Sequence, residues 1–569
     1  MCIRDRSISS EKVLANGNAE ATITVIARDE DGNPFGFTKI TLAQNGGNST
    51  IEKVQEITDE DGIATFRVRN ENVEEITYSA KSSGVTLNKK VSAKFVTVDP
   101  GQTTVEVDPE KVQANGEEES KIVVTARDAD GDELQGARVE LDVLNGTVSV
   151  DDDDKTTNSE GRVTFTVTSE LPQIVNFQIT AEDIELQNDL SISFIPVAPV
   201  SLSASNVQTR EFDANWEVVQ GAEHYVMDVS TDSSFTNFVG PYNAFDVGNT
   251  TTFTVEDVAP GTTYLYRVRA VSDGLIGANS QIIQTTTFPD VPEAVSASAR
   301  NALKFTANWQ ETAGARKYRL DVSTGPSFNN ILPDYSNLDV GTDLSYTVSN
   351  LEPGTSYYYR VRAEAGPRTS ASSNAIETST LTISSEQSEV ASDQLRVLAN
   401  GEQSNEIRIV VKSDEGVLLE GLEVKLNQEN SVSEIEQKQP ITDEEGVAIF
   451  GVSSPSAGTT TYTATAAGKL VGEISVEFLQ DDGVLRLGNN FPNPFIINSK
   501  IPVTVPRPMN VKLTIYNSLG VPVRTLKDEN VDTGYFEIPF NGADLAAGVY
   551  FYRLVTADGT KTGKMVLVK

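Results

Sequence analysis

The sequence predicts an all-β chain: a tandem array of Ig-like and fibronectin-like β-sandwiches that ends in a smaller β-sandwich. Three observations predict it, namely motifs that recur at constant offsets, apolar residues that alternate with polar ones, and Asp-Gly or Asn-Gly pairs between the alternating segments. Period-two alternation is typical of strands with one buried face, and Gly tolerates the positive φ of tight turns. A chain of 569 residues has room for several such domains.

The first repeat occurs in three copies. Ala15-Asn16-Gly17 returns 99 residues later as Ala114-Asn115-Gly116, and at an offset of 384 as Ala399-Asn400-Gly401. Ala27-Arg28-Asp29 returns as Ala126-Arg127-Asp128, again 99 residues on. Constant offsets at several separated motifs indicate duplicated domains.

Within each copy, apolar residues mark one strand face. Ile23, Val25 and Ala27 share a predicted inner face, and the matching triplets are Ile122, Val124 and Ala126, then Ile407, Ile409 and Val411. Copies of about 100 residues with this alternation are typical of β-sandwiches. Through V-x-A-N-G, the A-R-D-x-D-G turn and the D-x-x-G-x-A-x-F strand, they resemble the bacterial Ig-like repeats of the invasin and intimin adhesins.

A second repeat lies between the second and third copies. Ala214-Asn215-Trp216 returns 93 residues later as Ala307-Asn308-Trp309, and the run P-G-T-x-Y-x-Y-R-V-R-A occupies residues 260–270 and 353–363. These segments resemble fibronectin type III domains. The two tryptophans, Trp216 and Trp309, are expected to anchor the two cores.

The resemblance implies a tyrosine corner in each fibronectin-like domain. Tyr264 and Tyr357 stand at the corner position, where the hydroxyl bonds to backbone near the preceding turn. Alternation then places Tyr266, Val268 and Ala270 in the core, and Arg267 and Arg269 in water.

The C-terminal residues carry four motifs in order. They are residues 490–495 (NFPNPF), 511–526 (VKLTIYNSLGVPVRTL), 545–554 (LAAGVYFYRL) and the terminal 564–569 (KMVLVK). They resemble the C-terminal sorting domain of the bacterial type IX secretion system over about residues 485–569. Phe540 stands where that family commonly shows Trp, and we expect it to fill the same apolar niche. The resemblance implies export across an outer membrane, followed by release or surface anchoring.

Breaks in these patterns give the predicted domain boundaries. Residues 1–6 resemble translated sequencing adapter and are set aside. The remaining predicted domains are bacterial Ig-like at 7–98, 99–197 and 383–481, fibronectin type III at 198–289 and 290–382, and the sorting domain at 482–569. The linkers are short, so we expect domains stacked end to end as an extended rod.

Composition excludes several classes of function. The net charge is −37, with 82 acidic and 45 basic residues, so binding to nucleic acid or to anionic lipid is not expected. The single cysteine, Cys2, lies in the segment set aside, which leaves no disulfide or thiolate site. No run of eighteen apolar residues could span a bilayer, and no secretory signal opens the chain. We therefore expect a longer protein with a missing N-terminus.

No catalytic, cofactor-binding or metal-binding residue is assigned. The one histidine, His224, is matched by Lys317 in the other fibronectin-like copy, which favours a surface role. The run from Asp151 to Asp154 is expected to be an exposed loop, although calcium binding by an acidic loop stays open. Tyr358 is the outward tyrosine of its strand, too little for a sugar-binding face.

Two functions of different classes remain. The first is a non-catalytic exported rod, at the cell surface or secreted, that serves adhesion or spacing and meets the type IX secretion machinery through its C-terminal domain. Its further partner would be another cell surface, a matrix protein or a polysaccharide. The alternative is the C-terminal accessory region of a secreted hydrolase whose catalytic domain lies upstream.

Overall fold

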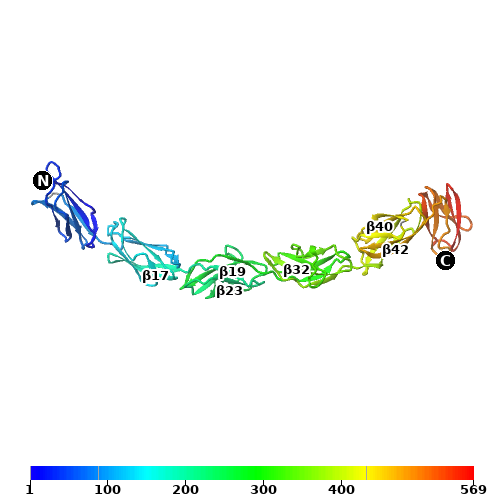
Figure 1. Ribbon diagram of the computed structural model, residues 1–569, viewed down its shortest axis with the longest axis horizontal. Helices are drawn as coiled ribbons and strands as arrows, with labels where there is room; N and C mark the ends of the chain where they lie inside the picture. Colours follow the sequence, from blue (N-terminus) through cyan, green and yellow to red (C-terminus); the bar gives the residue numbers. More distant parts are fainter. Residues whose placement is uncertain (1, 87–88, 431) are drawn as a thin grey trace. The chain divides into compact units, whose positions relative to one another are not determined.

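The computed structural model describes residues 2–86, 89–430 and 432–569 (Figure 1). These residues form β-strands throughout, together with one short 3-10 helix, η1 (Pro333–Tyr335). The chain divides into two units, Met1–Phe288 and Pro289–Lys569. The all-β class predicted from the repeats is confirmed.

The first Ig-like copy is a pair of sheets. One has the order β1-β3-β6-β5, formed by β1 (Cys2–Ile8), β3 (Ala21–Arg28), β6 (Ile63–Arg69) and β5 (Thr50–Gln55). The other has the order β2-β9-β7-β4, with β8 on β7, formed by β2 (Lys12–Leu14), β9 (Val91–Val96), β7 (Glu74–Ser82), β4 (Thr41–Asn45) and β8 (Val85–Thr86). Residues 2–6, which resemble adapter sequence, belong to β1 and pair with β3 at the edge of the first sheet.

The second copy repeats this arrangement. One sheet has the order β10-β12-β16-β14, formed by β10 (Thr104–Asp108), β12 (Ser120–Thr125), β16 (Arg162–Thr168) and β14 (Ser149–Val150). The other has the order β11-β18-β17-β13-β15, formed by β11 (Lys111–Gln113), β18 (Ile184–Ile195), β17 (Gln173–Ala181), β13 (Arg138–Val143) and β15 (Asp154–Thr156).

The third copy has the same two-sheet plan. One sheet has the order β35-β37-β40-β39, formed by β35 (Ile383–Ser392), β37 (Asn405–Ser413), β40 (Val447–Ser453) and β39 (Glu434–Gln439). The other has the order β36-β42-β41-β38, formed by β36 (Arg396–Leu398), β42 (Lys469–Leu479), β41 (Gly458–Ala466) and β38 (Val424–Gln428).

In every Ig-like copy a short early strand pairs in parallel with the last strand. β2 pairs with β9, β11 with β18, and β36 with β42. The remaining named strand pairs of these copies are antiparallel. The last strand of each copy is therefore hydrogen-bonded to the second strand of the same copy within one sheet.

The two fibronectin-like domains share one plan of three and five strands. The first has the sheets β19-β20-β23 and β22-β21-β24-β25, with β26 on β24: β19 (Ser201–Ser205), β20 (Phe212–Trp216), β23 (Thr252–Val255), β22 (Phe245–Gly248), β21 (His224–Ser230), β24 (Thr263–Ser272), β25 (Leu275–Ile276) and β26 (Ile283–Thr286). The second has the sheets β27-β28-β31 and β30-β29-β32-β33, with β34 on β32: β27 (Ala294–Ser298), β28 (Phe305–Trp309), β31 (Ser345–Val348), β30 (Leu338–Asp339), β29 (Lys317–Ser323), β32 (Ser356–Ala365), β33 (Arg368–Thr369) and β34 (Ile376–Ser379).

The C-terminal domain is a smaller sandwich. Its first sheet has the order β43-β44-β47, formed by β43 (Arg486–Leu487), β44 (Asn498–Val505) and β47 (Gly534–Asn541). Its second sheet has the order β46-β45-β48-β49, formed by β46 (Pro522–Val531), β45 (Met509–Tyr516), β48 (Gly548–Thr556) and β49 (Gly559–Leu567).

The recurring motifs of the Ig-like copies are turns with defined hydrogen bonds. The Asn16 side chain accepts bonds from the backbone N–H of Asn18 (3.0 Å) and Ala19 (2.8 Å), and Gly17 takes a positive φ of 72°. Asparagine oxygens commonly close such turns, and Gly reaches that φ without a steric cost. The Ala-Asn-Gly motif therefore recurs in the three copies because it forms the same turn in each.

The predicted inner faces are buried. Ile23, Val25 and Ala27 are fully buried, as are the matching triplets of the other two copies. Trp216 and Trp309 lie in the two fibronectin-like cores. Each domain therefore has an apolar core of its own, as the period-two pattern predicts.

Candidate functional site

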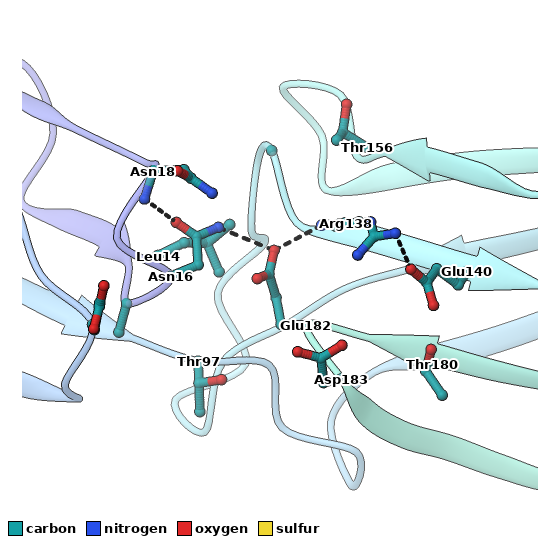
Figure 2. A pocket seen from close by; sticks show the side chains of 13 residues that line it. Leu14, Asn16, Asn18, Thr97, Arg138, Glu140, Thr156, Thr180, Glu182 and Asp183 are labelled. Carbon is teal, nitrogen blue, oxygen red and sulfur yellow. Dashed lines mark hydrogen bonds and ion pairs between the residues drawn. The ribbon is translucent and has the colours of Figure 1, made fainter.

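A cavity lies between the first and second Ig-like copies, within the first unit. Its volume is about 530 Å³. Figure 2 shows the side chains that line it. The Glu182 carboxylate lies at its centre, where it accepts bonds from Asn16 Nδ2 of the first copy (3.1 Å) and from the Arg138 backbone N–H of the second (2.7 Å). One carboxylate thus joins the two domains.

The residues that line this cavity come from both copies and form the contact between them, which we call the joint. Among the described residues its lining contains no aromatic ring, imidazole or thiol. The Arg138 side chain forms ion pairs with Glu140 and with Asp154. The Asp154 Oδ1 atom lies 3.0 Å from Arg138 Nε. The Glu182 carboxylate and the Arg138 side chain therefore already have hydrogen-bonding partners in or beside the cavity.

A cluster of three aspartates receives two lysines at the same joint. Asp128, Asp130 and Asp132 lie on the turn after β12, with one carboxylate oxygen of each within 4.8 Å of the others. Lys12 Nζ of the first copy lies 2.7 Å from Asp128 and 3.0 Å from Asp130, and it also pairs with Asp132. Lys94 adds a second pair to Asp130. The first copy thus supplies two ammonium groups to an acidic turn of the second.

These contacts shift both partners' pKa values. Hydrogen bonds from Lys94 and Lys12 lower the pKa of Asp130 to about 2, and bonds to Asp128 and Asp132 raise the pKa of Lys12. Burial opposes ionisation of Asp128, yet the bonds from Lys12 and the turn backbone outweigh it, so its pKa is also lowered. The joint is therefore an ion-paired contact at neutral pH.

The repeat pattern predicts Asp130 only as part of a turn, and the cluster was not predicted. The D-x-D-x-D spacing of residues 128–132 was the available signal, because it brings alternate carboxylates of one turn together. No local sequence pattern indicates the lysine partner, because Lys12 is separated from Asp128 by 116 residues. The Lys12 ammonium group is bonded to all three aspartates and occupies the centre of the cluster.

The run from Asp151 to Asp154 does not form a comparable cluster. Asp151 pairs with Lys155 at 2.7 Å and accepts a bond from the Thr166 backbone, while Asp154 pairs with Arg138. The four side chains are exposed, as expected. They act separately as surface pairing and turn groups.

His224 begins β21 and lies opposite Val271 in the sheet. Its counterpart Lys317 begins β29 and pairs with Asp339 (2.8 Å) and Glu364 (3.0 Å). The two copies thus use this position differently. Tyr358 points outward and bonds Glu377 at 2.9 Å.

The predicted tyrosine corners are present. The Tyr264 hydroxyl accepts the Ala259 backbone N–H at 2.7 Å, and the Tyr357 hydroxyl accepts that of Glu352 at 3.0 Å. Both rings are buried. Each corner therefore ties the loop before its strand to the core of its own domain.

The expectation that Arg267 and Arg269 lie in water is wrong. Asp228 on the neighbouring strand β21 is 1% exposed, and its carboxylate pairs with Arg267 Nε (2.8 Å) and Arg269 NH2 (2.9 Å). The Arg267 guanidinium also stacks on the Phe235 ring, 4.1 Å from its centroid. Each arginine is only about a fifth to a quarter exposed, because this sheet face is covered.

The second fibronectin-like domain repeats this triad. Asp321 pairs with Arg360 Nε at 3.0 Å and with Arg362 NH2 at 3.1 Å, and Arg360 stacks on Phe328. A buried carboxylate between two guanidinium groups neutralises the outer face of each central strand. The triad is thus a shared structural feature of the two domains.

The four C-terminal motifs converge in one sandwich. Asn493 of the NFPNPF motif bonds the edge strand β49: its Oδ1 accepts the Val566 N–H at 2.9 Å, and its Nδ2 donates to the Lys564 carbonyl. Phe495 continues this pairing through its own backbone and packs against Phe540, with ring centroids 5.6 Å apart. Phe540 is buried in the core, as expected for its niche.

A cavity of about 620 Å³ lies beside β47 in this domain. Its one guanidinium, that of Arg524, bonds the Asn541 carbonyl (2.6 Å) and the Asp544 carboxylate (2.8 Å). The Arg524 guanidinium therefore already has hydrogen-bond acceptors within the domain.

Comparison with known families assigns each of these sandwiches. Residues 5–96, 102–195 and 387–479 match the bacterial Ig-like domain (group 1). Residues 197–286 and 290–379 match the fibronectin type III domain, and residues 489–569 match the secretion system C-terminal sorting domain. The chain is thus a modular protein of bacterial Ig-like and fibronectin type III domains that ends in a sorting domain, and it is an exported protein of the cell surface or the extracellular space.

Individual relatives are more distant. The inverse autotransporter adhesin YeeJ of Escherichia coli (strain K12) is 31% identical over 170 residues, which is 29% of this chain and 7% of that protein. The chain therefore spans only a small part of the length of this relative.

Similar solved structures come from both module types. A D0-D1 domain structure of intimin is 17% identical, covers 34% of this chain and 98% of its own, and has a TM-score of 0.17. A two-domain fibronectin type III segment of chicken tenascin is 18% identical, covers 32% and 99%, and has a TM-score of 0.25. Invasin is 11% identical, covers 99% and 79%, and has a TM-score of 0.18. At these TM-scores the domain assignment rests on the family models.

In the part of the chain that the structure describes, no helix has the length and apolar character needed to cross a membrane.

Proposed function

We propose that this chain is a non-catalytic surface module that spaces or presents an adhesive element, and that its C-terminal sandwich delivers it through a type IX secretion system. The observation that carries the proposal is the convergence of the four terminal motifs in one domain that matches a sorting family. Five Ig-like and fibronectin-like sandwiches precede that domain. The adhesin named among the relatives supports the adhesive part.

The spacing role is supported by the contacts between neighbouring modules of the first unit. The Lys12 and Lys94 pairs to the aspartate turn, and the Asn16–Glu182 bond, connect the first two Ig-like copies directly. Paired contacts of this kind restrict bending at a short linker. Small-angle scattering of the full chain should therefore report an extended particle, and a compact one would contradict the spacer role.

Deletion of residues 485–569 tests the delivery role. In a bacterium with a type IX secretion system, the full chain should reach the surface or the medium, whereas the truncated chain should accumulate in the periplasm. Protease accessibility of whole cells distinguishes the two locations. Normal surface display of the truncated chain would refute the delivery role.

A further inference from the structure

The outer face of the sheet β46-β45-β48-β49 exposes apolar side chains. The inward residues of β48 (Tyr550, Tyr552 and Leu554) lie in the core, so Phe551 and Val555 point outward, 37% and 39% exposed. In register, Tyr516 and Lys564 flank Phe551. We call the patch formed by Tyr516, Val523, Phe551, Arg553, Val555 and Lys564 the outer patch.

The sorting domain as a whole is rich in such residues. Of the 33 exposed large apolar side chains in the described part of the chain, ten lie between residues 484 and 568. Val523, at 36% exposure, adds to the patch from the edge strand β46. Clustered apolar exposure on a soluble domain marks an interaction surface more often than an accident of packing.

The charge of this domain is opposite to that of the other domains. Residues 482–569 hold ten Lys and Arg against seven Asp and Glu, a net +3, whereas residues 1–481 hold 35 against 75, a net −40. A positively charged domain with an arginine on its surface that pairs with no carboxylate among the described residues is complementary to an acidic surface. The partner of the outer patch is therefore expected to be acidic where it meets the patch.

Arg553 lacks the neutralising carboxylate that the fibronectin-like domains provide. There, Asp228 lies between the outward Arg267 and Arg269, and Asp321 repeats the arrangement. In the sorting domain the residues opposite Arg553 are Thr514 and Thr562, and its guanidinium lies over the Tyr516 ring, 4.9 Å from the centroid. Within the described residues, neither Arg553 nor Lys564 has a carboxylate within 4.0 Å.

We infer that the outer patch is the surface by which the sorting domain docks on the secretion machinery. The partner surface presents a carboxylate to Arg553 and apolar side chains that cover Phe551 and Val555. Burial of the apolar residues supplies affinity, and the charge pair supplies orientation and rate of encounter. The inference rests on the delivery role proposed above, and it identifies which face of the domain performs it.

Charge and apolar variants of the full chain test the inference. Arg553→Glu and Phe551→Ser should each reduce export about tenfold or more, with the chain retained in the periplasm. Arg553→Lys should export nearly as well as the wild type. The matched controls are Lys469→Glu and Ile497→Ser, which change an exposed cation of β42 and an exposed apolar residue away from this sheet. Thermal unfolding of the purified chains establishes that each variant is folded.

Photo-cross-linking provides a second measurement that does not depend on the folding of the variants. A photoreactive phenylalanine at position 551 should cross-link to an acidic segment of a secretion-machinery protein. Cross-links to another copy of the chain, or none at all, would overturn the inference, as would normal export of folded Arg553→Glu and Phe551→Ser. If deletion of residues 485–569 blocks export while both variants export normally, the delivery role stands and only the docking face is wrong.

Discussion

The ring of Tyr552 lies against the backbone of Gly563 on the neighbouring strand. The two residues are register partners in β48 and β49, and a Cβ added at Gly563 would overlap the ring. The Tyr552 hydroxyl donates to the Gly488 carbonyl at 2.8 Å. The terminal strand therefore needs glycine at this position so that the tyrosine can cross the core.

Substitution of Gly563 should destabilise the sorting domain. Gly563→Val is expected to cost about 1–3 kcal/mol, because overpacking forces side chains and backbone apart. The control is Gly548→Ala in the adjacent strand, where the nearest atom to an added Cβ is 4.0 Å away. Denaturant unfolding of the full chain measures both. Equal stability of Gly563→Val and the wild type would contradict the steric argument.

Loss of the tyrosine-corner hydroxyl should weaken one domain at a time. Tyr264→Phe and Tyr357→Phe are each expected to cost about 1–3 kcal/mol, because the N–H of Ala259 or Glu352 loses its acceptor, the hydroxyl of a buried tyrosine. Tyr358→Phe serves as the control, since its hydroxyl is exposed and bonds a surface glutamate. Hydrogen exchange resolves the effect by domain, and an equal loss of protection in the other fibronectin-like domain would argue against a local tie.

Removal of the buried carboxylate should destabilise its fibronectin-like domain. Asp228→Ala leaves Arg267 and Arg269 without their shared partner and removes the acceptor of the Ala244 N–H. We expect a loss of about 2 kcal/mol, because the two arginines can still reach water. Asp246→Ala, a change at an exposed residue of β22 in the same domain, should have little effect on the unfolding midpoint.

The joint between the first two Ig-like copies should weaken in acid. The folded pKa of Asp130, about 2, lies below its usual 3.8, so its stabilising contribution is complete above about pH 4 and is lost as the pH falls toward 2. Lys12→Met should lower the unfolding temperature of the second copy at pH 7, and less so in high salt. Scanning calorimetry between pH 2 and 7 measures this.

The control for the joint is Lys39→Met, which removes a largely exposed lysine that pairs with Glu56. Its effect should be small. A Lys12→Met deficit of the same size at pH 2 as at pH 7 would show that the ion pairs do not hold the joint.

Much of the fold was predictable because it depends on local alternation and on repeats. The apolar triplets at Ile23 and its counterparts, the tryptophan anchors and the tyrosine corners all lie where period and offset place them. The outward arginines were misplaced because alternation assigns every second residue to water. Alternation does not show that Asp228 of the neighbouring strand pairs with both arginines, or that the Phe235 ring covers Arg267.

The missed features depend on distant residues. Lys12 meets the aspartate turn only after both domains have folded, and no local pattern in either segment indicates the other. The position of the two arginines, in contrast, could have been inferred from the sequence. Asp228, Arg267 and Arg269 recur together at the 93-residue offset as Asp321, Arg360 and Arg362, so comparison of the two repeats could have found the triad.

The parallel pairing of a short early strand with the last strand in each Ig-like copy bears on how the chain would respond to a pulling force. Once the first strand β1 is extended, tension on the two ends of the copy runs along β2 and β9, and it loads their cross-strand hydrogen bonds together in shear. The fibronectin-like domains have no such parallel pair among their described strands. Under flow or traction the fibronectin-like domains should therefore extend first, and the Ig-like copies should yield last.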